Sequence, residues 1–131
     1  MKHTLRLADY IDHMQQAAAQ AIGFVERMDK AAFLGDPRTQ SAVVYKLLVL
    51  GEAAGNVLSH HATFAAQHVD IPWRTIRATR NRVAHGYFDL NLDVVWDTVQ
   101  TALPQLLTLL PKVQDAAKRP MAEGDPPTAA S

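Results

Sequence analysis

The chain is predicted to be all-α, a four- to five-helix up-and-down bundle that dimerises through helix faces. Apolar residues recur at alternating steps of three and four along most of the chain, which places them on one side of a helix. No segment has the strict alternation that is typical of a strand. The 131 residues are enough for one domain that buries about two-thirds of its unfolded surface.

The first two helices are predicted from two apolar stripes and the break between them. The first stripe contains Ile11, Met14, Ala18, Ala21, Val25 and Met28. Gly35, Asp36 and Pro37 then interrupt the chain, and Asp36 can cap a second helix that has Pro37 at its first position. The second stripe contains Val43, Leu47, Leu50, Ala54 and Val57.

The second half predicts a short helix, a long helix and a tail. Asp70–Ile71–Pro72 is typical of a helix start, and the short helix is expected from Pro72 to His85, with Gly86 after its end. Asn91 can cap the last helix, in which Pro104 and Pro111 predict a kink or a split. Its stripe contains Leu92, Val95, Val99, Leu103, Leu106, Leu110 and Val113. The bundle is therefore expected over residues 1–117, and the proline-rich residues 118–131 as a disordered tail.

Six large apolar residues lie beside the stripes rather than on them. A small bundle cannot easily bury them alone, so they predict a homodimer. They are Val44, Leu48 and Leu58 on the second helix, and Trp96, Leu107 and Leu109 on the last.

Composition narrows the class of protein. Lys and Arg total 13 and so do Asp and Glu, which gives no overall charge that would favour nucleic acid. The chain has no cysteine, so it has no disulfide or thiolate metal site and fits a reducing cytoplasm. Its first residues do not resemble a signal peptide, and no window is expected to reach the roughly 20 apolar residues of a membrane span. A cytoplasmic protein without membrane contact is the expectation.

The segment from Arg80 to Tyr87 combines a permanent cation, an imidazole and a phenol within eight residues. The guanidinium fork of Arg80 suits a phosphate, and His85 can exchange a proton near neutral pH. Such a pair can cleave a phosphodiester without a metal. On one ideal helix, however, Arg80 and His85 would point about 140° apart. Either the helix ends at His85, or the site combines residues of two protomers.

Four arginines form a local cationic region between Ile71 and Phe88, where no acidic residue occurs. They are Arg74, Arg77, Arg80 and Arg82. The spacing of the first three fits a helix face that follows a phosphate backbone, and Arg74, Arg77 and Arg82 are candidate RNA contacts. The alternative is a solvated face on which the arginines pair with Asp89, Asp93 and Asp97.

Two further segments are interpreted as structural. His60–His61 lacks the spacing of a metal site and predicts surface histidines. Gly51 and Gly55 predict a close approach of helices, although Glu52 between them could anchor an arginine of the third helix.

The pattern Arg80-x4-His85-x-Tyr87 resembles the R-x4-H-x-Y signature of the HepT branch of HEPN-domain proteins. The resemblance extends over about Leu5–Val113, through Gly51–Glu52–Ala53, Ile71–Pro72–Trp73 and Asp93–Val94–Val95–Trp96 with Pro104. It departs at Tyr45–Lys46, where many relatives have an arginine.

The resemblance implies a toxin that is a metal-independent endoribonuclease without a cofactor, acting on RNA such as tRNA. Its antitoxin partner would be an MNT-type nucleotidyltransferase. Arg80 and His85 would be catalytic, Asn81 would support the site, and Tyr87 would be the residue that the partner adenylylates. Two alternatives remain: a non-catalytic HEPN module that binds nucleotide or RNA, and a helical adaptor for the nucleotidyltransferase.

Overall fold

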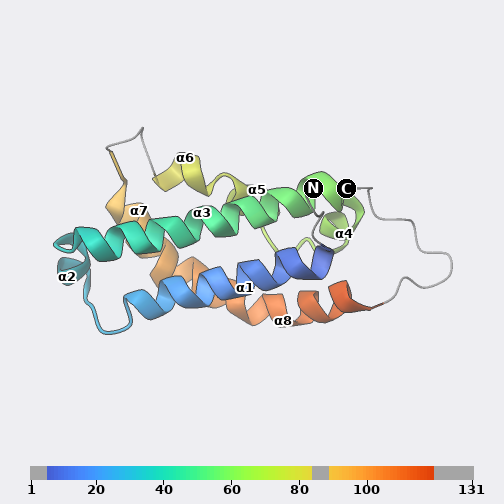
Figure 1. The fold of residues 1–131 in the computed structure, drawn as a ribbon, viewed down its shortest axis with the longest axis horizontal. Helices are drawn as coiled ribbons and strands as arrows, with labels where there is room; N and C mark the ends of the chain where they lie inside the picture. The colour runs from blue at the N-terminus through green and yellow to red at the C-terminus, as the bar shows by residue number, and fades with distance from the viewer. Residues whose placement is uncertain (1–5, 84–88, 120–131) are drawn as a thin grey trace, which may run out of the picture.

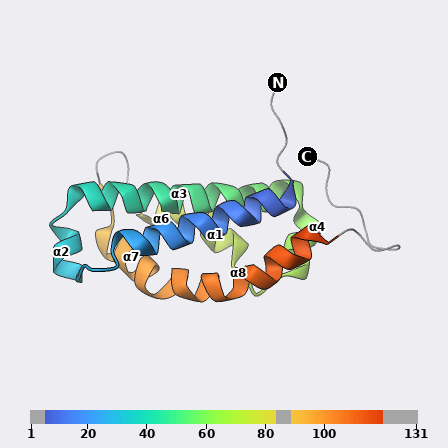
Figure 2. The same cartoon turned by 60° about the horizontal axis from the view of Figure 1, so that its bottom comes forward.

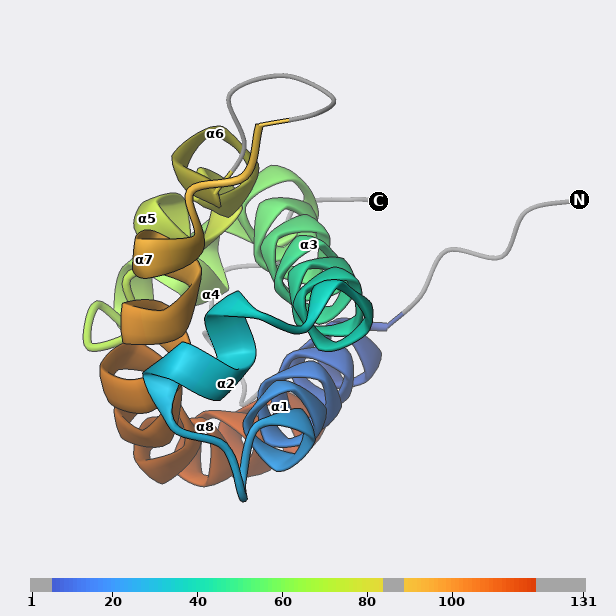
Figure 3. The same ribbon diagram turned by 90° about the vertical axis from the view of Figure 1, so that its left-hand side faces the viewer.

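The computed structural model describes residues 6–83 and 89–119, and these ranges contain helices and no β-strand. The helices form rods arranged around one core, seen end-on in Figure 3. They are α1 (Leu7–Phe24), α3 (Pro37–His60), the pair α5 (Trp73–Arg77) and α6 (Thr79–Val83), and the run of α7 (Leu92–Asp97), η1 (Thr98–Ala102) and α8 (Leu103–Lys118). Successive rods run in opposite directions (Figure 1), which confirms the predicted all-α up-and-down bundle.

The first helix, α1, lies between α3 and α8 (Figure 2). Its buried face matches the predicted stripe from Ile11 to Ala21. Small residues in this face, Ala17, Ala18 and Ala21, leave room for the close approach of the neighbouring helices. The helix ends at Phe24, so Met28 belongs to the connection that follows and not to the helix.

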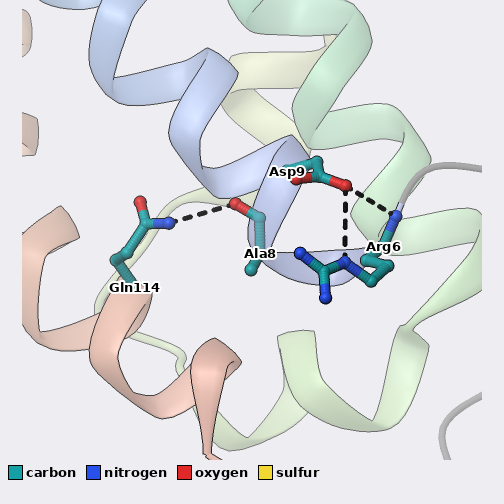
Figure 4. Close-up of polar contacts among 4 residues, drawn as sticks. All are labelled: Arg6, Ala8, Asp9 and Gln114. Carbon is teal, nitrogen blue, oxygen red and sulfur yellow. Dashed lines mark hydrogen bonds and ion pairs between the residues drawn. The ribbon is translucent and has the colours of Figure 1, made fainter.

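Polar contacts fix the beginning of α1 (Figure 4). The backbone N–H of Arg6 donates to Oδ2 of Asp9 at 3.1 Å, and Arg6 Nε lies 3.8 Å from the same oxygen. Gln114 of α8 donates through Nε2 to the carbonyl oxygen of Ala8 at 3.1 Å. This buried amide ties the ends of α1 and α8 together.

Two short helices were not predicted, because five or six residues are too few for a periodic stripe. The first, α2 (Lys30–Leu34), is capped by Asp29 and buries Phe33 completely, with its ring centroid 5.4 Å from that of Trp96. Gln40 donates to the carbonyl oxygens of Phe33 and Leu34 and so satisfies the end of α2. The second is α4 (Ala62–Gln67), which follows α3.

The start of α3 is the predicted one. The Asp36 carboxylate accepts from the backbone N–H of Thr39 at 3.2 Å and from the Thr39 hydroxyl at 2.7 Å, and Pro37 occupies the first turn. These hydrogen bonds hold the pKa of Asp36 below its ordinary value.

By length and composition α3 could cross a membrane, contrary to the expectation from the sequence, since an 18-residue window within its 24 residues has a mean hydropathy of 1.3. Eight of its residues are buried, in the face that packs against α1 and α5. That face accounts for part of the apolar character of α3.

The last rod is split, as its prolines predicted. Asn91 caps α7 by accepting from the N–H of Val94 at 3.2 Å. The wider turn η1 follows, in which the N–H of Leu103 donates to the carbonyl oxygen of Thr98. Pro104 lacks an N–H, and its ring clashes with the carbonyl group four residues earlier, so the regular α-helical hydrogen bonding is interrupted at this point. Pro111 lies inside α8, which continues to Lys118, one residue past the predicted boundary. The predicted tail from residue 120 onward lies outside the described residues.

Most of the six large apolar residues that lie beside the stripes are covered within one chain. Five of the six residues pack partly buried against the core: Val44, Leu58, Trp96, Leu107 and Leu109. Leu48 remains 37% exposed, and Tyr45 on the same helix is 61% exposed. Of the six residues that predicted a homodimer, Leu48 is therefore the one that still supports it.

Candidate active site

The arginine-bearing segment is divided into α5 and α6, so the continuous helix predicted from Pro72 to His85 is wrong. The break lies at Ala78, where the buried Thr79 hydroxyl donates to the carbonyl oxygen of Ile76 at 2.6 Å. This bond replaces a backbone bond that would have continued the helix. The carbonyl oxygen of Ala78 then accepts from the N–H groups of Asn81 and Arg82 and starts α6.

Buried side chains hold this segment against the bundle. Trp73 is 5% exposed and donates through Nε1 to the carbonyl oxygen of His68 at 3.0 Å. Ile76 and Val83 are also buried, while Arg74, Arg77 and Arg80 are exposed. The apolar residues therefore fix the backbone, and the arginines are left to the surface.

The predicted close approach occurs at Gly51 of α3. A Cβ atom at Gly51 would lie 3.0 Å from the carbonyl oxygen of Ile76, which is closer than side chains normally tolerate. At Gly55 a Cβ atom would lie 3.3 Å from Cγ and Cδ of Arg77. The two glycines thus let the end of α5 and the stem of Arg77 lie directly on α3.

Gly51→Ala is expected to lower the free energy of unfolding by up to about 2 kcal/mol. Overpacking costs about 1–3 kcal/mol, and the better helix propensity of alanine returns about 1 kcal/mol. The matched control is Gly23→Ala in α1, where no atom lies within 4 Å of the new Cβ and a gain of up to about 1 kcal/mol is expected. Urea unfolding of both variants makes the measurement. Equal shifts would contradict the close approach at Gly51.

Arg77 and Arg80 share one hollow with the polar face of α3, which we call the Arg80 hollow. Its volume is about 660 Å³. It is lined by Leu48, Gly51, Glu52, Gly55, Asn56 and Ser59 of α3, with Arg77 of α5 and Arg80 of α6. The α3 residues recur at helical spacing, so this polar face could have been found from the sequence once the arginines were placed opposite it.

The signature is only partly within the described residues. Arg80 and Asn81 are exposed on α6, whereas His85 and Tyr87 fall in 84–88, outside the described residues. The described residues on either side of this range are hydrogen-bonded to each other, since the carbonyl oxygen of Val83 accepts from the N–H of Asn91 at 2.7 Å. The predicted end of the helix at His85 lies outside the described residues as well.

The three candidate RNA contacts do not share one surface. Arg74 and Arg77 line a second hollow next to the Arg80 hollow, with Arg77 common to both. Arg82 lines a different hollow of about 230 Å³ between α5, α6 and the last rod, together with Asp70. The structure therefore groups Arg74 and Arg77 with Arg80 and separates Arg82 from them.

In the described residues, the four arginines do not pair with the carboxylates of Asp89, Asp93 and Asp97, as the alternative had it. Asp93 pairs with Lys30 of α2, with Nζ and Oδ1 3.0 Å apart, and this contact raises the pKa of Lys30. Within residues 6–83 and 89–119, the four arginines form no ion pair with Asp89, Asp93, Asp97 or Glu52.

At Tyr45–Lys46, the ammonium of Lys46 lies 5.3 Å from the ring centroid of Tyr45.

His61 is buried, so the expectation of a surface histidine is wrong there. It is 7% exposed, its ring meets that of Tyr10 edge-on at 6.1 Å, and neither ring nitrogen has a hydrogen-bond partner in the described part of the chain. Burial and the nearby His60 lower its pKa.

Residues 6–83 and 89–119 contain no group of three His, Cys, Asp or Glu side chains that could hold a metal ion.

Acidification is expected to destabilise the fold through His61. Its pKa is lowered from 6.5 in the folded chain, so the unfolded chain binds more protons as the pH falls below about 6.5. The free energy of unfolding therefore falls from there until the pH passes the folded pKa, and His61→Phe should reduce this loss. His68, whose pKa is also lowered by burial, stays in both proteins. Urea midpoints at pH 7.5 and 5.5 test this, with the exposed His13→Phe as control; a parallel loss in His61→Phe and wild type would refute it.

The fold and the site define a class, an all-α bundle with an arginine-lined hollow whose Arg80 begins an R-x4-H-x-Y sequence. The sequence profile described as "Ribonuclease HepT-like" matches residues 14–113. The chain belongs to this HepT-like family.

Three relatives of this chain have names that contain the word ribonuclease or RNase. A protein of Thermococcus cleftensis named as a probable ribonuclease HepT is 33% identical over 98 residues, which cover 75% of this chain and 86% of that protein. A protein of Methanocaldococcus jannaschii with the provisional name of an RNase is 32% identical over 98 residues, 75% of each chain. A third, from Caldanaerobacter subterraneus and also provisionally named an RNase, is 30% identical over 97 residues, 74% of this chain and 84% of that one. No solved structure matches the chain.

Proposed function

We propose that this protein is a metal-independent endoribonuclease and the toxic component of a toxin–antitoxin system in the cytoplasm. The observation that carries the proposal is Arg80, exposed beside Arg77 in one hollow and followed in the sequence by His85 and Tyr87. Family membership and the ribonuclease names of three relatives support the choice of RNA as substrate. The intact Arg80, His85 and Tyr87 favour an enzyme over a binding module or an adaptor.

The proposed reaction uses the 2′-hydroxyl of the RNA as nucleophile. His85 transfers protons, as base toward the 2′-hydroxyl or as acid toward the leaving 5′-oxygen. Arg80 stabilises the charge that builds on the phosphoryl oxygens, and Asn81, next to it on α6, supports the site. The products carry a 2′,3′-cyclic phosphate, and DNA is resistant because it lacks the nucleophile. Incubation of the purified protein with RNA and with DNA of the same sequence in EDTA tests this.

We further propose that the active form is a homodimer. Leu48 is exposed on α3 and lines the Arg80 hollow, and the exposed Tyr45 lies three residues before it. A second copy that packs on these two side chains would enclose the hollow. A second protomer would also supply its His85 to the phosphate that Arg80 holds, which is one of the two arrangements that the sequence leaves open. Light scattering should give the mass of two 14.4 kDa chains, and a fully active single chain would contradict the arrangement.

Binding of RNA is expected to be salt-sensitive and carried by Arg74, Arg77 and Arg82. Each phosphate contact with single-stranded RNA contributes a slope of about −0.7 in log K against log salt. Arg77→Ala should flatten the slope by about one contact, and the exposed Arg38→Ala should not. A 2′-O-methyl RNA, which cannot be cleaved by this route, serves as the ligand. If the triple variant Arg74→Ala, Arg77→Ala, Arg82→Ala binds as the wild type does, the arginines form only a solvated face.

A cognate MNT-type nucleotidyltransferase is the proposed antitoxin, and Tyr87 the residue that it adenylylates. The basis is the resemblance of the R-x4-H-x-Y segment together with family membership.

A further inference from the structure

A second hollow adjoins the Arg80 hollow and has a different chemistry. We call it the Val69 hollow, and its volume is about 450 Å³, within the range of small-ligand sites. Its walls come from α3, α4, the connection after α4, and α5. The apolar part of the lining includes Leu58, Ala62, Ala66, Val69 and Pro72. Val69 is 78% exposed, the largest exposed fraction among the large apolar residues that the structure describes.

The charged part of the same hollow is entirely positive. Arg74 and Arg77 line it, and none of its lining residues is acidic. The hollow therefore offers two chemistries side by side, an apolar surface and guanidinium groups. A ligand that fits both has an apolar face joined to an anion.

Arg77 connects the two hollows. Its Cγ and Cδ atoms lie directly over Gly55, where a Cβ atom would be only 3.3 Å away, so the stem crosses α3 at this residue. Arg77 lines both the Arg80 hollow and the Val69 hollow. Arg80, Arg77 and Arg74 thus follow one another from the proposed cleavage site to the apolar surface.

We propose that the Val69 hollow receives an unpaired base of the RNA, while Arg77 and Arg74 hold the adjoining phosphates. This inference rests on the proposed ribonuclease function and names its substrate class, RNA with unpaired nucleotides near the cleaved bond. In a duplex the bases are stacked and paired, and only an unpaired base can turn into a hollow in the protein surface. Apolar side chains and guanidinium planes contact the face of a base, which every base has, so the hollow sets the form of the substrate rather than its sequence.

The test separates base from phosphate by equilibrium binding to the full chain. Three uncleavable ligands of equal length are compared: a single-stranded 2′-O-methyl RNA, the same strand in a duplex, and an abasic spacer oligomer with the same number of phosphates. Wild type should bind the single strand about tenfold more tightly than the abasic oligomer, the scale expected when part of a base covers apolar surface in the hollow. It should also prefer the single strand to the duplex.

Filling the hollow should remove only the part of binding that depends on the base. Ala66→Trp, at an exposed position of α4, should weaken binding of the single strand about tenfold and leave binding of the abasic oligomer unchanged. Ala62→Trp repeats the test in case one variant fails to fold, and Ala19→Trp on the exposed side of α1 is the matched control. Arg74→Ala should weaken binding of both oligomers alike.

The outcomes distinguish this inference from the function on which it rests. Equal binding of the single strand and the abasic oligomer by a wild type that cleaves RNA overturns the base site alone. Absence of RNA binding overturns the proposed function as well. If Ala66→Trp and Ala62→Trp change the oligomeric state without changing the base-dependent binding, the hollow is an interface between copies of this chain, and the inference is wrong.

Discussion

Cleavage of RNA in EDTA is expected to be lost in His85→Ala and to fall by at least about a hundredfold in Arg80→Ala. The first change removes the group that moves protons, and the second removes the cation that stabilises the phosphoryl oxygens. Arg80 is exposed in its hollow, and no carboxylate of the described residues lies within ion-pair distance of it. Its charge is therefore available for a substrate phosphate. Initial rates on a labelled single-stranded RNA give the measurement.

Matched controls separate chemistry from folding in this experiment. Arg38→Ala removes an exposed arginine from the first turn of α3, far along the chain from the signature, and should cleave at the wild-type rate. The helical circular dichroism of all variants should equal that of wild type. Activity that persists in His85→Ala, or that needs Mg²⁺, would rule out this mechanism.

Adenylylation of Tyr87 by the partner nucleotidyltransferase is expected to silence the enzyme. Tyr87 is two residues from His85 in the sequence, and both lie between Val83 and Asn91, whose backbones are hydrogen-bonded to each other. A phosphate attached there can pair with Arg80 in place of the substrate, since a guanidinium binds phosphate strongly. The nucleoside adds bulk at the same position. Mass spectrometry after co-expression with the partner locates the AMP.

The control for this prediction is Tyr45, which lies on α3 three residues before Leu48 of the Arg80 hollow. Tyr45 is 61% exposed on α3, and Tyr45→Phe should still be modified and silenced. Tyr87→Phe should escape both. AMP found on another residue, or modification and silencing of Tyr87→Phe, would overturn the assignment. Silencing without any modification would show that the partner acts by occlusion.

The sequence predicted the long elements because each depends on local rules. The caps at Asp36 and Asn91, the stripes of the long rods and the split near Pro104 follow from spacing and from backbone chemistry. The break at Ala78 could not be predicted in the same way. It depends on the buried hydroxyl of Thr79, and burial there is set by packing against α3 rather than by neighbours in the chain.

For the candidate site, the sequence proposes the residues but not how they are arranged in space. Charge pattern identified the arginines, yet their division between surfaces depends on how α5 and α6 lie on α3. The pattern gave no reason to separate Arg82 from Arg74 and Arg77. His61 was also misjudged, because a histidine at the end of α3 is buried only when the start of α1 brings Tyr10 against it.

The most direct test of the central claim is the identity of the nucleophile. A single-stranded RNA is incubated with wild-type protein in EDTA, beside the same strand in which one nucleotide at the mapped cleavage position carries a 2′-deoxyribose. The account predicts cleavage of the RNA to a product ending in a 2′,3′-cyclic phosphate, and no cleavage at the deoxy position. Cleavage at the deoxy position, or a product without a cyclic phosphate intermediate, would contradict it.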